Sequence, residues 1–145
     1  PVASFNQLDR PKKAGSIGLP IWGVDFRLVD AEGQVITEAG VPGEIQIKGH
    51  NIMKGYYRRP EATSESIKDG WFHSGDLATV DENGYLTIVD RKRDMIKTGG
   101  ENVASREVEE ALYQIPEVSE VAVVGLPHPR WVEAVVAMVV VKHSL

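Results

Sequence analysis

The feature that most restricts the fold is a strict alternation of apolar and polar residues in a short segment between two glycines. Residues 44–48 read Glu-Ile-Gln-Ile-Lys. Because successive side chains of a strand point to opposite faces, we expect Ile45 and Ile47 to face a core. The same alternation predicts that Gln46 and Lys48 face water. This segment indicates a half-buried strand within a β-rich region.

Turn signals on either side of this strand predict two β-hairpins. Apolar residues of the segment 26–36 flank Asp-Ala-Glu-Gly at 30–33, which is a typical hairpin pattern. A second hairpin is predicted from 77 to 90 through Asp-Glu-Asn-Gly at 81–84, because Asn-Gly is the strongest short hairpin signal. Between the hairpins, Arg-Pro-Glu-Ala-Thr at 59–63 predicts the start of a short helix with proline in its first turn.

The pattern changes in the last third of the chain, where the clearest helix of the sequence follows a charged stretch. The helix is expected at 105–115, with Ser105 as its N-cap and Pro116 as its stop. Two β-rich segments follow, at 118–126 and 132–142. A helix surrounded by short strands predicts a small α+β unit, which looks unfinished at the end of the sequence.

These patterns divide the chain into two domains joined by a hinge. We predict a β-rich, distorted barrel-like domain at 1–90, a hinge at 91–93 and the first half of a small α+β domain at 94–145. The expected fold class is therefore α+β. The sequence begins Pro-Val-Ala-Ser without an initiator methionine, and we expect the chain to be a piece of a longer protein.

Composition and charge argue against several classes of function. The chain has 21 acidic and 16 basic residues and a net charge of −5, which argues against nucleic acid as a partner. The absence of cysteine excludes disulfides and thiolate metal sites, and it fits a cytoplasmic protein. The most apolar run, 132–141, is interrupted by Glu133 and is too short to cross a bilayer. We therefore expect no transmembrane segment, and peripheral association with a membrane stays open.

One candidate for ligand binding is Asp76, within Trp-Phe-His-Ser-Gly-Asp-Leu-Ala at 71–78. An ionised carboxylate only accepts hydrogen bonds, and it can take two of them from the vicinal hydroxyls of a ribose. The alternative is that Asp76 is a turn or cap residue. We expect His73 to be a structural or surface histidine, since the sequence identifies no partner for it.

Three further segments are ambiguous when each is taken alone. The stretch 90–97 carries four cations, which fit either a phosphate-bearing ligand or a solvated face. In the run 98–103, a Gly-Gly pair permits either close approach of the backbone to a ligand or a simple turn. The glycines, tyrosines and the Arg-Pro dipeptide between 43 and 63 are expected to form a strand and a turn with packed aromatic residues.

Together, and in this order, the four segments closely resemble the late core motifs of the adenylate-forming superfamily. The resemblance extends from about Gly15 to Lys142. The run Met-Ile-Lys-Thr-Gly-Gly-Glu-Asn-Val at 95–103 is most similar to fatty-acyl and related acyl-CoA synthetases. The resemblance implies a ligase that forms an acyl-adenylate from a carboxylic acid, here expected to be a fatty acid, and ATP with Mg²⁺. The acyl group then passes to coenzyme A, and the small C-terminal domain is a lid that rotates between the two steps.

The resemblance also implies roles for individual residues in handling the nucleotide. Asp76 would bind the ribose hydroxyls of ATP, and Arg91 would assist it. Lys97 would be the catalytic residue that approaches the adenylate in one orientation of the lid. Fixed donors and acceptors of this kind act by positioning and electrostatics.

The remaining roles concern rotation of the lid and coenzyme A. Arg93 falls at the hinge position, which is Asp or Lys in many relatives. Gly99 and Gly100 would lie beside the pantetheine of coenzyme A after the rotation, where a side chain would obstruct the thiol.

Other parts of the family pattern are absent from the sequence. It contains no Ser/Thr/Gly-rich phosphate loop, no Tyr-Gly-x-Thr-Glu segment and no late C-terminal lysine of the family type. The ligands of Mg²⁺ are also expected outside the chain, so we assign no metal ligand within it. We expect the chain alone to be inactive without the missing N-terminal part of the same protein. Two alternatives remain: an adenylation domain that loads a carrier-protein thiol, and a noncatalytic β-rich binding module.

Overall fold

The computed structural model describes residues 2–142 and divides the chain into two compact units, the first ending at Ile88 and the second beginning at Val89. The end of the predicted small domain, 143–145, lies outside the described residues, as does residue 1. In chain order, the elements are β1 (Ser4–Phe5), β2 (Leu19–Pro20), β3 (Val24–Val29), β4 (Val35–Ile36), β5 (Gly43–Gly49), α1 (Pro60–Ser66), β6 (Ile67–Lys68), β7 (Trp71–Val80), β8 (Leu86–Arg91), β9 (Ile96–Thr98), β10 (Glu101–Val103), α2 (Ser105–Tyr113), β11 (Val118–His128) and β12 (Val132–Val141).

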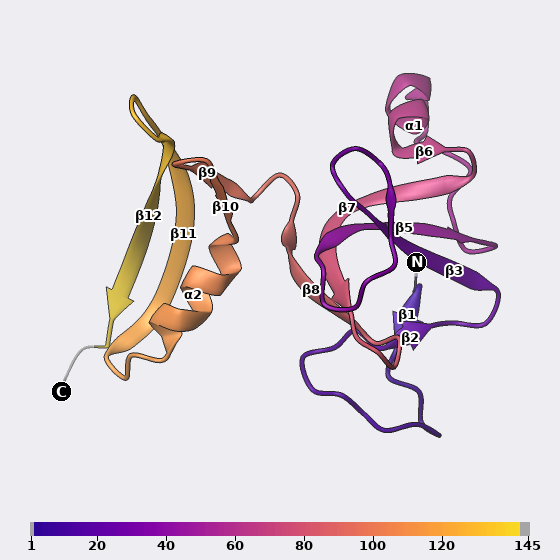
Figure 1. Ribbon diagram of the computed structural model, residues 1–145, viewed down its shortest axis with the longest axis horizontal. Coiled ribbons are helices and arrows are strands. Elements are labelled where there is room, and N and C mark those ends of the chain that lie inside the picture. Colours follow the sequence, from indigo (N-terminus) through magenta and orange to yellow (C-terminus); the bar gives the residue numbers. More distant parts are fainter. Residues whose placement is uncertain (1, 143–145) are drawn as a thin grey trace. The chain divides into compact units, whose positions relative to one another are not determined.

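The first unit is built on an antiparallel sheet with the strand order β4-β3-β5-β7-β6, and β8 pairs with β7 (Figure 1). The pairs β3–β4 and β7–β8 confirm both predicted hairpins. Helix α1 begins at Pro60, which confirms the predicted short helix. The α+β class is confirmed as well, with strands predominating, and the described strands form an open sheet and no closed barrel.

The apolar core of this unit gathers side chains from several strands. Its buried members come from β3, β5, β7 and β8, and partly buried apolar residues pack against them. Burial of a leucine or isoleucine side chain stabilises a fold by about 1.5–3 kcal/mol. The buried members are Leu28, Ile45, Ala78 and Leu86.

The opposite face of β5 corrects one prediction. Gln46 was expected to face water, but only 3% of its surface is exposed, and Glu44 is buried as well. Lys48 is exposed as predicted. The reason is that β5 lies inside the sheet between β3 and β7, so long side chains of the neighbouring strands cover its polar face. Arg27 of β3 and His73 of β7 both contact Gln46.

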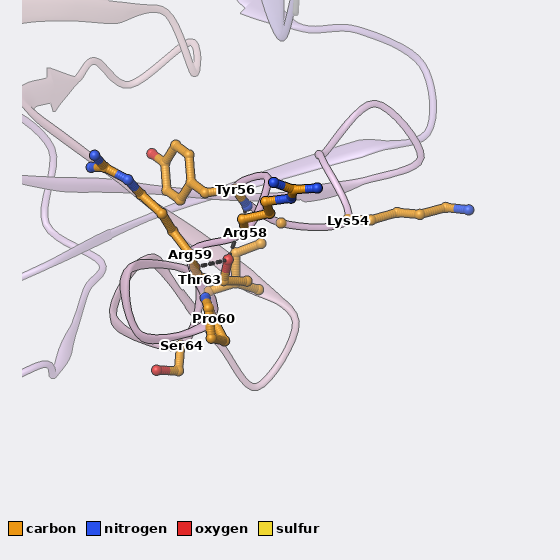
Figure 2. Close-up of a pocket in the computed structure, with 9 residues that line it drawn as sticks. Lys54, Tyr56, Arg58, Arg59, Pro60, Thr63 and Ser64 are labelled. Carbon is orange, nitrogen blue, oxygen red and sulfur yellow. Dashed lines mark hydrogen bonds between the residues drawn. The ribbon is translucent and has the colours of Figure 1, made fainter.

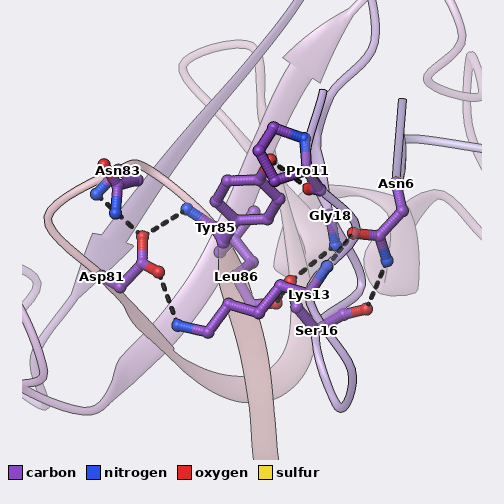
Figure 3. A network of polar contacts seen from close by, with 9 residues as sticks. All are labelled: Asn6, Pro11, Lys13, Ser16, Gly18, Asp81, Asn83, Tyr85 and Leu86. Carbon is purple, nitrogen blue, oxygen red and sulfur yellow. Dashed lines mark hydrogen bonds and ion pairs between the residues drawn. The ribbon is translucent and has the colours of Figure 1, made fainter. Parts of the chain in front are cut away.

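The segment before β2 is held against the β7–β8 hairpin by polar contacts (Figure 3). Ser16 donates its hydroxyl to the Leu86 carbonyl oxygen at 2.7 Å. The Lys13 ammonium lies 2.6 Å from the Asp81 carboxylate, in the turn of the hairpin. This hydrogen bond is the main reason why the pKa of Asp81 is lowered from its ordinary value, and backbone N–H donors of the turn lower it further. The Asp-Glu-Asn-Gly turn is thereby fastened to the N-terminal segment.

The second unit is a four-stranded antiparallel sheet in the order β10-β9-β12-β11, with α2 packed against β11 (Figure 1). The predicted N-cap is wrong: the helix starts at Ser105 itself, and Ala104 occupies the cap position without a capping side chain. The Ser105 hydroxyl instead donates to the buried carboxylate of Asp90 at 3.1 Å. The helix ends at Tyr113, before Pro116.

The strand β11 is longer than predicted at the turn before β12, which begins at Val132 as predicted. β11 continues through Pro127 to His128, so that the turn begins only at Pro129. His128 stabilises it, because its ring stacks on Trp131 at 4.4 Å between centroids and its Nδ1 accepts the backbone N–H of that residue. No helix in the described part of the chain is long and apolar enough to cross a membrane.

Candidate functional site

A bulge in β7 sets the position of the first candidate residue. Two rungs of the β5–β7 ladder define it, one pairing Gln46 with His73 and the other pairing Glu44 with Leu77. Between these rungs, one residue of β5 is opposite three residues of β7, 74–76. Extra residues on one strand leave the ladder locally and redirect their side chains, a device that is common beside active sites.

Asp76 is the last residue of this bulge. The preceding Gly75 has a φ of +74°, a conformation that glycine adopts without steric cost. The Ser74 hydroxyl oxygen accepts the backbone N–H of Asp76 at 3.0 Å, which closes the bulge on itself. Asp76 is partly buried, and the bulge defines the backbone that carries its carboxylate. Such a carboxylate can accept two hydrogen bonds from neighbouring hydroxyls.

His73 has the partners that sequence reasoning did not identify. Its ring nitrogens lie 3.1 and 3.4 Å from the Gln46 amide nitrogen, and its Nδ1 lies 3.5 Å from a carboxylate oxygen of Glu44. The expectation that His73 is structural agrees with these contacts. The available signal was the spacing of Glu44 and Gln46, which places both on one face of β5.

The charged stretch begins the second unit and forms a turn. The backbone N–H of Arg91 donates to the side chain of Asp90 at 2.7 Å, and the N–H of Asp94 donates to the Arg91 carbonyl at 2.9 Å. The Arg93 side chain is 76% exposed, with its Nε 3.4 Å from the Asp94 carboxylate. A pocket of about 560 Å³ opens beside it, lined by residues of this turn, β9, α2, β11 and β12.

The Gly-Gly pair is the turn of the hairpin formed by β9 and β10. Thr98 pairs with Glu101 across it, and Gly99 and Gly100 have φ values of +59° and +91°. Positive φ at both central residues is the signature of a type I′ hairpin turn. A Cβ added at either glycine would meet nothing within 4 Å. The prediction of a simple turn is therefore correct for the local backbone, and the space around the two glycines is open.

Lys97 lies on β9, one residue before this turn region. Its side chain is exposed, and its backbone N–H donates to the Glu133 carboxylate at 2.7 Å. Asp76 belongs to the first unit, whereas the other predicted site residues belong to the second. The second group consists of Arg91, Arg93, Lys97, Gly99 and Gly100.

The segment around the Arg-Pro dipeptide borders another pocket, of about 640 Å³ (Figure 2). The Thr63 hydroxyl holds this segment together, because it accepts a hydrogen bond from the Tyr56 N–H at 2.9 Å and donates one to the Arg59 carbonyl at 2.8 Å. The prediction of packed aromatic residues is wrong here, because Tyr57 is 84% exposed with the Arg58 guanidinium over its ring. Figure 2 shows the cationic side chains pointing in different directions, so they do not form one anion site. Within residues 2–142, no group of three or more His, Asp or Glu side chains could hold a metal ion.

Two family models match the chain, one near each end. The model described as "AMP-binding enzyme" matches residues 1–57, and that described as "AMP-binding enzyme C-terminal domain" matches residues 107–144. The bulge, the charged turn and the Gly-Gly hairpin lie between these two matches.

Individual relatives and solved structures match across this central region as well. A feruloyl-CoA synthase of Amycolatopsis sp is 52% identical over 89% of the chain, and a long-chain-fatty-acid–CoA ligase of Escherichia coli O157:H7 is 46% identical over 98%. The chain spans 26% and 25% of these relatives, about a quarter of their length.

The ATP-bound structure of MatB from Rhodopseudomonas palustris is 39% identical, with a TM-score of 0.91 over 97% of this chain and 28% of that one. The o-succinylbenzoate CoA synthetase of Bacillus subtilis with its acyl-adenylate intermediate is 37% identical, with a TM-score of 0.83 over 92% of this chain and 27% of that one.

Proposed function

Because the chain belongs to the AMP-binding enzyme family, we propose that it is part of an AMP-forming acyl-CoA synthetase. The observation that carries this proposal is the likeness to an ATP-bound structure over 97% of the chain. In this proposal, the first unit holds the nucleotide, and the second begins the lid. The longer protein contributes the rest of the site, and the chain alone is inactive.

The first half-reaction joins the acid to AMP. A carboxylate oxygen of the acid attacks the α-phosphorus of ATP, the bond to the bridging oxygen breaks, and pyrophosphate leaves. Asp76 accepts hydrogen bonds from the two ribose hydroxyls and Arg91 assists it, so that the nucleotide is oriented for the attack. Lys97 supplies positive charge near the adenylate while the lid is in its first orientation.

The second half-reaction transfers the acyl group to coenzyme A. The thiolate sulfur attacks the acyl carbon, the thioester forms, and AMP leaves with the electrons of the broken carbon–oxygen bond. We place the hinge for the intervening lid rotation at Arg91–Arg93, with Arg93 as the pivot. Gly99 and Gly100 then lie beside the pantetheine, and their exposed turn would let the thiol pass close to the backbone.

We propose a fatty acid as the substrate, because a long-chain-fatty-acid–CoA ligase matches 98% of the chain. ATP would enter as its Mg²⁺ complex, with protein ligands of the ion outside this chain. The reaction would take place in the cytoplasm, a location that fits the absence of cysteine.

The proposal is tested by assaying the full-length protein for pyrophosphate release and acyl-CoA formation with long-chain fatty acids and with ferulic acid. The variant Asp76→Ala should raise the KM for ATP by about tenfold or more, since charge-assisted hydrogen bonds are each worth about 1.5–3 kcal/mol. The matched control is Asp25→Ala, which removes an exposed carboxylate of β3 in the same unit.

Three results would contradict parts of the proposal. If the full-length protein releases no pyrophosphate with any acid, the proposed activity is wrong. If ferulic acid is turned over and fatty acids are not, the activity stands and the fatty-acid assignment is wrong. If Asp76→Ala and Asp25→Ala leave the KM for ATP equally unchanged, Asp76 is only a bulge residue.

A further inference from the structure

We infer that Glu44, Gln46 and His73 form a polar clamp that fixes the bulge carrying Asp76, and that they act as positioning residues for the nucleotide. The inference rests on the proposed function, because that function gives Asp76 its ligand. Within the clamp, the three side chains act on Asp76 through the backbone of β7.

Burial makes the contacts of the clamp strong constraints, because buried polar groups must find hydrogen-bond partners. Gln46 is 3% exposed and Glu44 is 6% exposed, while the His73 side chain is 24% exposed. An unpaired amide or carboxylate at such sites would be costly. The contacts among these three residues are therefore strong constraints on the strands that carry them.

Arg27 sets the orientation of the Gln46 amide. Its Nε donates to the amide oxygen of Gln46 at 2.6 Å. The guanidinium of Arg27 is itself held over the Trp71 ring, 4.2 Å from the centroid. Because the amide oxygen is engaged by Arg27, the amide NH₂ must point the other way, toward His73.

This orientation determines which nitrogen of His73 carries the proton. The amide NH₂ only donates, and it lies 3.1 Å from Nε2 and 3.4 Å from Nδ1 of His73, so we assign the nearer nitrogen, Nε2, as the acceptor. The ring proton of the neutral imidazole then resides on Nδ1, which faces the Glu44 carboxylate at 3.5 Å. One imidazole thus contacts both the Gln46 amide and the Glu44 carboxylate.

The clamp holds together the two ends of the bulge. His73 stands in the rung before the bulge, and Glu44 stands in the rung after it, opposite Leu77. The contact between His73 and Glu44 therefore spans the bulge. Without it, the two rungs can slide, and register changes redirect every side chain between them. Asp76 is one of those side chains.

The experiment compares variants of the full-length protein. His73→Ala should raise the KM for ATP roughly tenfold while the KM values for the acid and coenzyme A stay within about twofold, because misplacement affects only the nucleotide. Glu44→Ala should act in the same way. Glu44→Gln should restore the wild-type KM for ATP, because it keeps an acceptor for the Nδ1 proton.

A matched control separates positioning from stability. Tyr85→Phe removes a buried hydrogen bond of the same unit, from the Tyr85 hydroxyl to the Pro11 carbonyl at 2.7 Å, and leaves the bulge untouched. It should lower the melting temperature without changing the KM for ATP. Hydrogen exchange at the amides of 74–76 in the same proteins should be faster in His73→Ala than in Tyr85→Phe or wild type.

Each outcome decides the inference independently of the proposed function. An unchanged KM for ATP in His73→Ala, beside a raised KM in Asp76→Ala, overturns the clamp and leaves the function standing. The clamp is also overturned if His73→Ala and Tyr85→Phe raise the KM values for all substrates to the same extent. If the wild-type protein has no activity, or if His73→Ala does not fold, exchange at 74–76 in Glu44→Ala and Glu44→Gln decides. Faster exchange in the alanine variant alone supports the clamp, and any other pattern overturns it.

Discussion

Substitution of Gly100 by alanine and by leucine separates the two roles of the Gly-Gly hairpin. Both variants place a Cβ on a residue whose φ is +91°. The conformational cost of this Cβ is about 1–2 kcal/mol and is the same for both. A Cβ added at this position meets no atom within 4 Å, so the structure predicts no clash at the Cβ of either variant. The two variants should therefore be equally destabilised.

The expected loss of stability can be checked by thermal unfolding. For a small domain, each kcal/mol lowers the melting temperature by about 4–8 °C, so each variant should lose roughly 4–16 °C. The proposed role in coenzyme A binding adds a difference that depends on side-chain size. Leucine would obstruct the thiol in the second half-reaction, whereas alanine would obstruct it much less.

The two half-reactions are measured separately in the full-length protein. Pyrophosphate release in a single turnover should be similar in Gly100→Ala and Gly100→Leu. Acyl-CoA formation should be at least about tenfold slower in the leucine variant, because small displacements of reacting groups cost large factors in rate. If both variants lose both steps to the same extent, Gly100 is a turn residue and its proposed role is wrong. A leucine variant less stable than the alanine variant would refute the structural part of the reasoning.

Two further predictions concern stability of the first unit. Gly18→Ala should be more destabilising than Gly15→Ala by about 1–3 kcal/mol in urea unfolding. Both glycines have positive φ, but a Cβ at Gly18 would clash with the Phe5 backbone, whereas one at Gly15 would meet nothing within 4 Å. Equal free energies of unfolding in the two variants would contradict this prediction. The hydrogen bond from Lys13 lowers the pKa of Asp81. The stability that this hydrogen bond gives the folded state should therefore be present above about pH 4 and lost as the pH falls further. The melting temperatures of wild type and Asp81→Asn should therefore differ at pH 7 and converge near pH 2, and a difference independent of pH would argue against the reasoning.

Local patterns determined much of the fold. The hairpin turns at 30–33 and 81–84, the helix start at Pro60 and the end of α2 before Pro116 were all predictable from the sequence. The physical reason is that these features depend on the φ of glycine or proline and on hydrogen bonds within a few residues. Such preferences act before any distant part of the chain is in place.

Predictions that depended on what lies across a sheet were less successful. The alternation at 43–49 placed Gln46 in water, and the structure buries it under Arg27 and His73. In the same way, Ser105 is predicted to be a helix cap, whereas its hydroxyl donates a hydrogen bond to Asp90, 15 residues away. Alternation tells which residues share a face, and it does not tell whether neighbouring strands cover that face.

The candidate site also combines features that the sequence indicates with features that only the tertiary structure shows. The resemblance of four ordered segments to the adenylate-forming superfamily singled out Asp76 and the Gly-Gly pair, because each segment taken alone was also compatible with a simple turn. Only the tertiary structure decided that Asp76 stands in a bulge, since a bulge is a mismatch of register between two strands separated by many residues. The clamp beneath it likewise joins residues 44 and 46 to residue 73. Burial and register are properties of strands in contact, and no local pattern of β7 contains the position of β5.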